Sequence, residues 1–128
     1  MSNRRRSGMK NLYRTDFLRS PAWYARRTRW FRDHTPAGGL LACAGCGQEA
    51  LPGHLELHHL DYQGVTLSAG TWQAWEKDDD LVPLHPYCHD LLHRLIDRDT
   101  ILTAHRSRRD ATAHALRALR TRLTREVS

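Results

Sequence analysis

The cysteines and several histidines of this 128-residue chain are spaced as metal ligands. Cys43 and Cys46 form a C-x-x-C pair, and a tetrahedral zinc ion held by such a pair needs two more nitrogen or sulfur ligands. His85 and Cys88 repeat the same spacing some forty residues later. We therefore expect one structural zinc ion bound by Cys43, Cys46, His85 and Cys88, which would tie the start of a small domain to its end.

A second interpretation of the cysteines stays open. Cys43 and Cys46 could form a redox pair, with Cys88 as a buried thiol of the core. A redox C-x-x-C usually opens a helix in a thioredoxin-like unit, and the flanking "AGCG" is not typical of such a helix. The spacing therefore favours zinc.

A second group of imidazoles has the spacing of a catalytic metal site. His89 and His93 lie four residues apart on a predicted helix, so their rings share one face. His58, at the end of a predicted strand, is the candidate third ligand. Three protein ligands leave coordination positions open for water or substrate, as in catalytic sites.

The stretch "LELHHLDY", residues 55–62, places His59 directly beside His58. Successive side chains of a strand point to opposite faces, so the two imidazoles cannot do the same job by pointing the same way. An imidazole has an ordinary pKa of about 6.5, which suits proton abstraction near neutral pH. We therefore expect separate roles for the two residues.

Short elements must position these side chains, and the pattern predicts an α+β domain. Ser20 and Pro21 form a capping signal for a helix from about Pro21 to Asp33, with Trp23, Trp30 and Phe31 as its apolar stripe. The elements expected after this helix are short strands at 40–43 and 55–60, a long irregular loop at 64–79, an extended segment at 80–84, and a helix from Pro86 that buries Leu91, Leu92, Leu95 and Ile96.

The C-terminal part of the chain predicts a basic amphipathic helix. Ser107 and Asp110 resemble a capping box. Apolar Leu116, Leu119 and Leu123 follow at helical spacing, and the other faces carry Arg117, Arg120, Arg122 and Arg125. This helix could pack on the core, lie on DNA or bind a protein partner. The expected organisation is a disordered basic arm over 1–12, a domain over 13–97 and a helical extension over 98–128.

The net charge of +6 is unevenly distributed along the chain. Residues 1–34 carry +8, residues 35–93 carry −7 and residues 94–128 carry +5. Eighteen of the 20 basic residues are arginine, whose guanidinium can hold phosphate bidentately. We expect nucleic-acid binding, with a solvated arginine-rich surface as the alternative. The candidate phosphate contacts are Arg26, Arg27, Arg29 and Arg94.

Nothing in the sequence indicates a membrane or secreted protein. No run approaches the roughly 18 apolar residues of a membrane span, and no apolar stretch follows the basic N-terminus to make a signal peptide. Three cysteines are too few for a disulfide scaffold. We expect a soluble, cytoplasmic protein.

Together the motifs resemble the HNH endonucleases of the His-Me finger (ββα-metal) superfamily, in the phage and bacterial subgroup with a zinc knuckle. The motifs are "CAGC", "LELHHLDY", Asp80 in "DLVPLHPYCH", and "CHDLLH". The stretch "FLRSPAWYARR" also resembles the Ser-Pro-x-Trp helix that precedes the knuckle in many members. The resemblance covers roughly Tyr13 to Ile96. His85 stands where the family usually has cysteine, and Asp80 where it has asparagine.

The resemblance implies a small ββα-metal core, stapled by a structural zinc ion, that hydrolyses DNA phosphodiester bonds. It implies one catalytic divalent cation, Mg²⁺, Mn²⁺, Ni²⁺ or Zn²⁺, bound by His58, His89 and His93. It also implies that His59 is the general base and that Asp80, through its backbone or its carboxylate, orients it. The family's products are a 5′-phosphate and a 3′-hydroxyl.

Two rival functions stay open at this point. The chain could be a non-catalytic zinc module that binds nucleic acid through its basic arms. It could also be a nuclease subunit that depends on a protein partner, with the C-terminal helix as the docking element. The sequence does not indicate an oligomeric state.

Overall fold

The computed structural model describes residues 14–98 and 107–127 of the chain. The predicted basic arm over 1–12 lies outside the described residues, as does the start of the predicted extension at 99–106. The protein is a mixed α and β fold, as the sequence predicts. Its elements in chain order are a helical segment at 14–18, α2 (Pro21–His34), β1 (Leu41–Ala42), β2 (Glu49–Ala50), β3 (Glu56–His59), β4 (Val65–Ser68), β5 (Thr71–Ala74), β6 (Leu81–Leu84), α3 (Pro86–Arg98) and α5 (Arg108–Val127).

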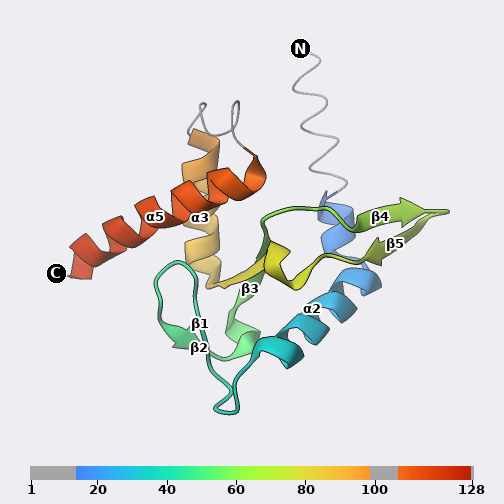
Figure 1. Ribbon diagram of the computed structural model, residues 1–128, viewed down its shortest axis with the longest axis horizontal. Coiled ribbons are helices and arrows are strands. Elements are labelled where there is room, and N and C mark those ends of the chain that lie inside the picture. Colours follow the sequence, from blue (N-terminus) through green and yellow to red (C-terminus); the bar gives the residue numbers. More distant parts are fainter. Residues whose placement is uncertain (1–13, 99–106, 128) are drawn as a thin grey trace.

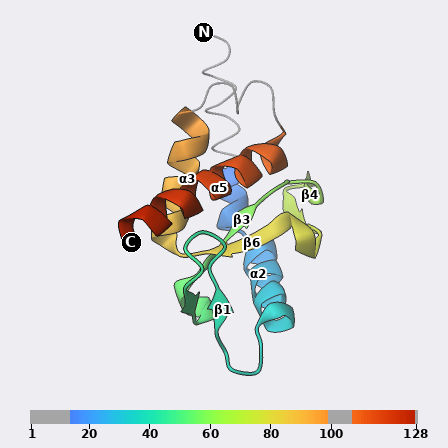
Figure 2. The ribbon, with the colours of Figure 1, turned by 60° about the vertical axis from the view of Figure 1, so that its left-hand side comes forward.

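The centre of the fold is an antiparallel pair of strands, β3 and β6. In this pair His58 lies opposite Val82 and His59 lies opposite Leu81. Helix α2 lies on one side of the pair, and α3 with α5 lies on the other (Figures 1 and 2). Because side chains alternate along β3, each neighbouring histidine faces a different set of helices.

Helix α2 begins with the cap that the sequence predicts and ends one residue later than expected. Ser20 Oγ accepts a hydrogen bond from the backbone N–H of Trp23 at 3.2 Å, and Pro21 occupies the first turn. Trp23, Trp30 and Phe31 are each 5% exposed. Their predicted role as one buried apolar stripe is therefore confirmed.

The prediction of a long irregular loop over 64–79 is wrong, because β4 and β5 form a hairpin there. Val65 pairs with Ala74, and Ser68 pairs with Thr71. The two-residue turn between the strands has positive φ at both positions, 51° at Ala69 and 78° at Gly70, which suits a tight hairpin turn. Alanine is uncommon in this conformation, so the turn carries a weak sequence signal.

Arg26 has a structural role, and its prediction as a phosphate contact is wrong. Its side chain is 3% exposed. The guanidinium donates to the Glu76 carbonyl oxygen through Nε at 3.2 Å and Nη2 at 2.8 Å, and to Asp78 Oδ1 at 2.5 Å. Trp30 Nε1 also donates to the Asp78 carbonyl oxygen, at 3.1 Å. These bonds fasten α2 to the segment between the hairpin and β6.

Helix α5 packs on the core, which is one of the three arrangements that its sequence allowed. The predicted cap is present, because Ser107 Oγ accepts from the backbone N–H of Asp110 at 3.1 Å. The helix buries one face, made of Ala111, Thr112, Ala115, Leu116 and Leu119. It crosses α3 in both ribbon views (Figures 1 and 2). Among the described residues, no helix is long and apolar enough to span a membrane.

Replacing Arg26 with alanine should destabilise the protein by about 2–3 kcal/mol, since the buried Glu76 carbonyl would lose its donors. The control is Arg29→Ala on the same helix, at a half-buried position, which should cost less than about 0.5 kcal/mol. Urea unfolding followed by circular dichroism measures both. Equal, small effects would contradict the structural role of Arg26.

Candidate metal centres

The first candidate centre begins in a tight turn between β1 and β2. The backbone N–H of Gly47 donates to the Cys43 carbonyl oxygen at 2.9 Å, and Gly47 has a φ of +80°, which glycine adopts without strain. The C-x-x-C pair therefore sits in a turn between strands and does not open a helix. This local structure disfavours the thioredoxin-like redox interpretation.

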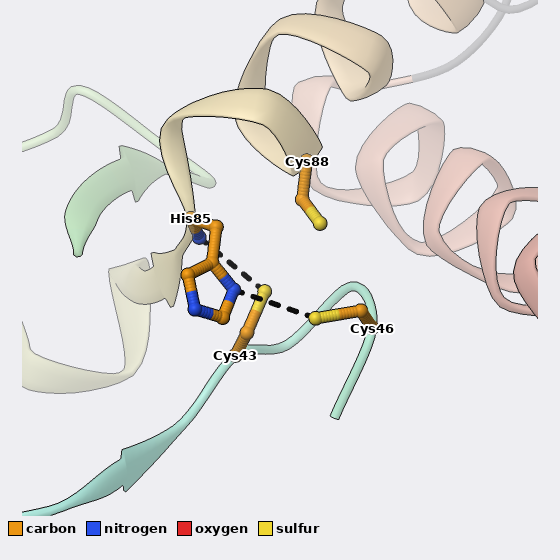
Figure 3. A group of neighbouring side chains, drawn as sticks. All are labelled: Cys43, Cys46, His85 and Cys88. Atoms are coloured by element: carbon orange, nitrogen blue, oxygen red, sulfur yellow. Dashed lines mark hydrogen bonds between the residues drawn. The ribbon is translucent and has the colours of Figure 1, made fainter. Parts of the chain in front are cut away.

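Four ligand atoms converge at this turn, from Cys43, Cys46, His85 and Cys88. They all lie within 4.8 Å of one another, and Figure 3 shows the two turn cysteines pointing toward the residues at the start of α3. Cys46 Sγ lies 3.4 Å from His85 Nδ1. Tetrahedral zinc with ordinary bond lengths would place such a sulfur and nitrogen about 3.5 Å apart. The cluster fits a structural zinc ion.

The thiols of this cluster have unequal acidity. Burial opposes ionisation of Cys43, but the backbone N–H groups of His85, Cys46 and Gly45 outweigh it and lower the pKa to about 7. Two of these N–H groups, from Gly45 and His85, lie 3.3 Å from Cys43 Sγ. Burial and the neighbouring Cys43 raise the pKa of Cys88 to about 12. A cation would relieve this repulsion and allow the other thiols to ionise.

The second candidate centre consists of His58, His89 and His93, as the sequence predicts. His58 Nδ1 lies 3.2 Å from His89 Nε2, which lies 3.0 Å from His93 Nε2. Tetrahedral zinc would place two such nitrogens about 3.3 Å apart. His89 Nε2 has either one proton or one lone pair, so it cannot bond well to both neighbours at once. The three nitrogens fit a shared cation better than they fit one another.

The three imidazoles are held in the neutral form that binds metal ions. Burial is the largest cause, and the positive charge of Arg108 adds to it. The pKa of His58 falls to about 2, and the pKa values of His89 and His93 fall to about 4. No proton therefore has to leave these rings before a cation binds at neutral pH.

His59 points to the other side of β3 and is held by Glu76. Its Nε2 lies 2.7 Å from Glu76 Oε2, and both side chains are buried, at 2% and 0% exposure. Its ring stacks on Tyr62, with centroids 4.3 Å apart, and lies 4.6 Å from the ring of Trp23. Burial lowers the pKa of His59, although the hydrogen bond and charge of Glu76 oppose this shift.

Asp80 acts on the strand of His59 through its backbone, which is one of the two predicted routes, and its carboxylate has another partner. Its carboxylate pairs with Arg109 of α5, and its carbonyl oxygen accepts from the backbone N–H of Leu60 at 2.7 Å. The second bond holds the strand that carries His59. Glu76 supplies the carboxylate beside His59, because the β4–β5 hairpin returns the chain to His59 at that residue.

Two further residues beside the histidines were missed in the sequence. Arg108 Nε donates to the carbonyl oxygen of His59 at 2.6 Å, and Thr112 Oγ1 lies 3.0 Å from His58 Nε2. Both residues belong to α5, more than forty residues from the histidines they contact. No local spacing could have indicated these contacts.

A cavity of about 340 Å³ joins the two sides of the histidine pair. Its polar lining consists of His58, His59, His89, His93, Tyr62, Thr15, Arg14, Arg108 and Asp97. Two arginines and one aspartate give this cavity a net positive wall. The four arginines predicted to contact phosphate are not among the residues that line this cavity. Arg26 is buried, and Arg94 pairs with Asp90 on the surface. Arg27 donates to the carbonyl oxygens of Pro52 and Leu55.

Comparisons with protein-family models, with curated proteins and with solved structures found no match to this chain. The resemblance to HNH endonucleases therefore rests on the motifs, and the two centres rest on the geometry of the described residues.

The purified protein should carry one zinc ion per chain at the cysteine cluster. Replacing the ligand His85 with alanine should reduce the zinc content and lower the thermal midpoint, because the site loses one of four ligands. The control is His54→Ala, an exposed histidine near the same turn, which should keep one zinc ion. Mass spectrometry of the metal content measures the zinc bound per chain in each variant. Equal zinc content in the two variants would contradict the assignment of His85 as a zinc ligand.

Acid should destabilise the protein through the three-histidine cluster. The pKa values of His89 and His93 are lower in the fold than the ordinary 6.5, so the unfolded chain binds more protons between about pH 6.5 and 4. Their contribution to stability is complete above pH 6.5 and is lost as the pH falls through that interval. Urea unfolding should show that the free energy of unfolding falls less between about pH 6.5 and 4 in His93→Gln than in His54→Gln. Release of zinc by acid affects both variants, so the comparison isolates the histidine cluster. Identical pH profiles would contradict this cause.

Proposed function

We propose that this chain is a metal-dependent endonuclease that hydrolyses DNA phosphodiester bonds. One observation carries the proposal. Three neutral imidazoles converge on one point at the wall of a positively charged cavity, and a fourth imidazole, His59, lines the same cavity. A ligand set of three leaves positions for a substrate oxygen and water, as hydrolytic metal sites require.

The order of elements also supports the proposal. The antiparallel pair β3–β6 leads directly into α3, and the metal ligands come from β3 and α3. This order resembles the ββα arrangement that the resemblance implies, and the cysteine cluster links the β1–β2 turn to the start of α3. The ligands implied by the resemblance and the ligands grouped by geometry are the same residues.

The cation bound by His58, His89 and His93 would neutralise charge on a phosphate oxygen and on the leaving 3′ oxygen. Imidazole ligands favour Zn²⁺ or Ni²⁺ by affinity, while Mg²⁺ and Mn²⁺ are favoured by availability. Arg14 and Arg108 would attract the phosphate to the cavity, since both guanidinium side chains line it.

His59 would act as the general base in this mechanism. If its Nε2–H donates to Glu76, then Nδ1 is the nitrogen left to take a proton from the attacking water. The carboxylate of Glu76 would stabilise the imidazolium that forms. Tyr62 and Trp23 fix the plane of the ring, and His59 lines the cavity.

Supercoiled plasmid should be nicked or linearised by the purified zinc-loaded protein when one of Mg²⁺, Mn²⁺, Ni²⁺ or added Zn²⁺ is supplied. His59→Ala should reduce the cleavage rate by about 10²–10⁴-fold, the usual contribution of a general base, and leave plasmid binding intact. His54→Ala, the matched surface histidine, should cleave like the unmodified protein. Undiminished cleavage by His59→Ala would refute the assignment of the base.

The same assay separates the rival functions. A plasmid that is shifted on a gel but never cut, with every cation tried, would indicate a non-catalytic nucleic-acid-binding module. Cleavage that appears only after cell extract is added would indicate a nuclease subunit that needs a partner.

A further inference from the structure

The two ring nitrogens of His58 have separate partners. Nδ1 faces the cluster, 3.2 Å from His89 Nε2, and Nε2 faces α5, 3.0 Å from Thr112 Oγ1. His58 and Thr112 are both 0% exposed. The contact between Nε2 and the hydroxyl is therefore shielded from solvent, and Thr112 is the partner that the structure gives to Nε2.

When the hydroxyl of Thr112 is the acceptor, this hydrogen bond leaves His58 in the tautomer that can bind a cation. A neutral imidazole carries one proton, on either Nδ1 or Nε2. When Thr112 Oγ1 accepts from Nε2–H, the lone pair of Nδ1 is left pointing at His89 and His93. The opposite tautomer would place a proton in the centre of the ligand cluster.

Helix α5 is held in place at both candidate metal centres. At its first turn, Arg108 donates to the carbonyl oxygen of His59. Further along the helix, Leu119 packs on the turn that carries Cys43 and Cys46. A Cβ added at Gly45 in this turn would lie 3.1 Å from Cδ2 of Leu119. Arg120 Nε also donates to the carbonyl oxygen of Ala44, at 2.9 Å. The hydroxyl of Thr112 is therefore presented to His58 by a helix that is fixed on either side of it.

We propose that α5 is a component of the three-histidine metal site and that Thr112 is a positioning residue for the ligand His58. The inference rests on the metal site of the proposed function, and it does not depend on DNA hydrolysis. Outer partners of metal-bound imidazoles typically contribute a factor of about 10–100 to metal affinity.

The test uses the full zinc-loaded chain titrated with Ni²⁺ in a calorimeter. Thr112→Val removes the hydroxyl with little change in shape and should weaken Ni²⁺ binding about 10–100-fold. Thr112→Ser keeps the hydroxyl and should restore most of the affinity. The control is Thr121→Val on the exposed face of the same helix, where the hydroxyl donates to the carbonyl oxygen of Arg117; it should bind Ni²⁺ like the unmodified protein.

A second measurement reports the tautomer without added metal. Nitrogen-15 spectra of the histidines, with the His58 signal assigned through His58→Gln, should show the Nε2–H form of His58 in the unmodified protein and in Thr112→Ser. Thr112→Val should raise the fraction of the Nδ1–H form. A purely structural role for Thr112 would lower thermal stability in the valine variant and leave the tautomer unchanged, which would overturn the inference.

The outcomes separate the inference from the proposed function. Absence of Ni²⁺ binding to the unmodified protein would overturn both. Equal Ni²⁺ binding by the unmodified protein and Thr112→Val would overturn the role of Thr112 alone and leave the proposed nuclease standing. Equal weakening in the valine and serine variants would also overturn it, because the hydroxyl would then not be the cause.

Discussion

The alternation of side chains along β3 is the constraint on which the rest of the structure depends. Two adjacent imidazoles must point to opposite faces of one strand, so the molecule needs a different environment on each side. On one side α3 and α5 surround His58 with two imidazoles and a hydroxyl. On the other side Trp23 of α2 and the residues that flank the β4–β5 hairpin, Tyr62 and Glu76, enclose His59 with aromatic rings and a carboxylate.

Each environment is held by long-range polar contacts rather than by the strand itself. Arg26 donates hydrogen bonds to the backbone carbonyl oxygen of Glu76. This contact holds Glu76 where its carboxylate reaches His59. Arg108 and Arg109 tie α5 to the backbone of His59 and to the carboxylate of Asp80. Buried polar groups are costly unless they are paired, so these contacts specify where α2 and α5 lie on the core. Some of the arginines that indicated nucleic-acid binding in the sequence therefore stabilise the fold through internal hydrogen bonds and ion pairs.

The sequence predicts the elements that local spacing determines and the two sets of candidate ligands, and little beyond them. The C-x-x-C turn, the i and i+4 pair His89 and His93, and the Ser20 cap all follow from geometry within a few residues, and the structure contains each of them. The contact of His59 with Glu76 depends on a hairpin whose Ala-Gly turn gives a weak signal. The burial of Arg26 and the approach of Thr112 depend on acceptors that only tertiary packing supplies. Partners of the functional residues were therefore harder to predict than the residues themselves.

In the proposed metal site, one strand delivers His58 to the cation and keeps His59 away from it. X-ray absorption at the nickel edge, on zinc-loaded protein given one equivalent of Ni²⁺, tests this claim most directly. The predicted result is a nickel ion with three imidazole ligands, no sulfur ligand, and light-atom ligands completing the shell. A fourth imidazole would place His59 in the coordination sphere, and a sulfur ligand would place the ion at the cysteines. Either result would show that β3 does not separate the two histidines in this way.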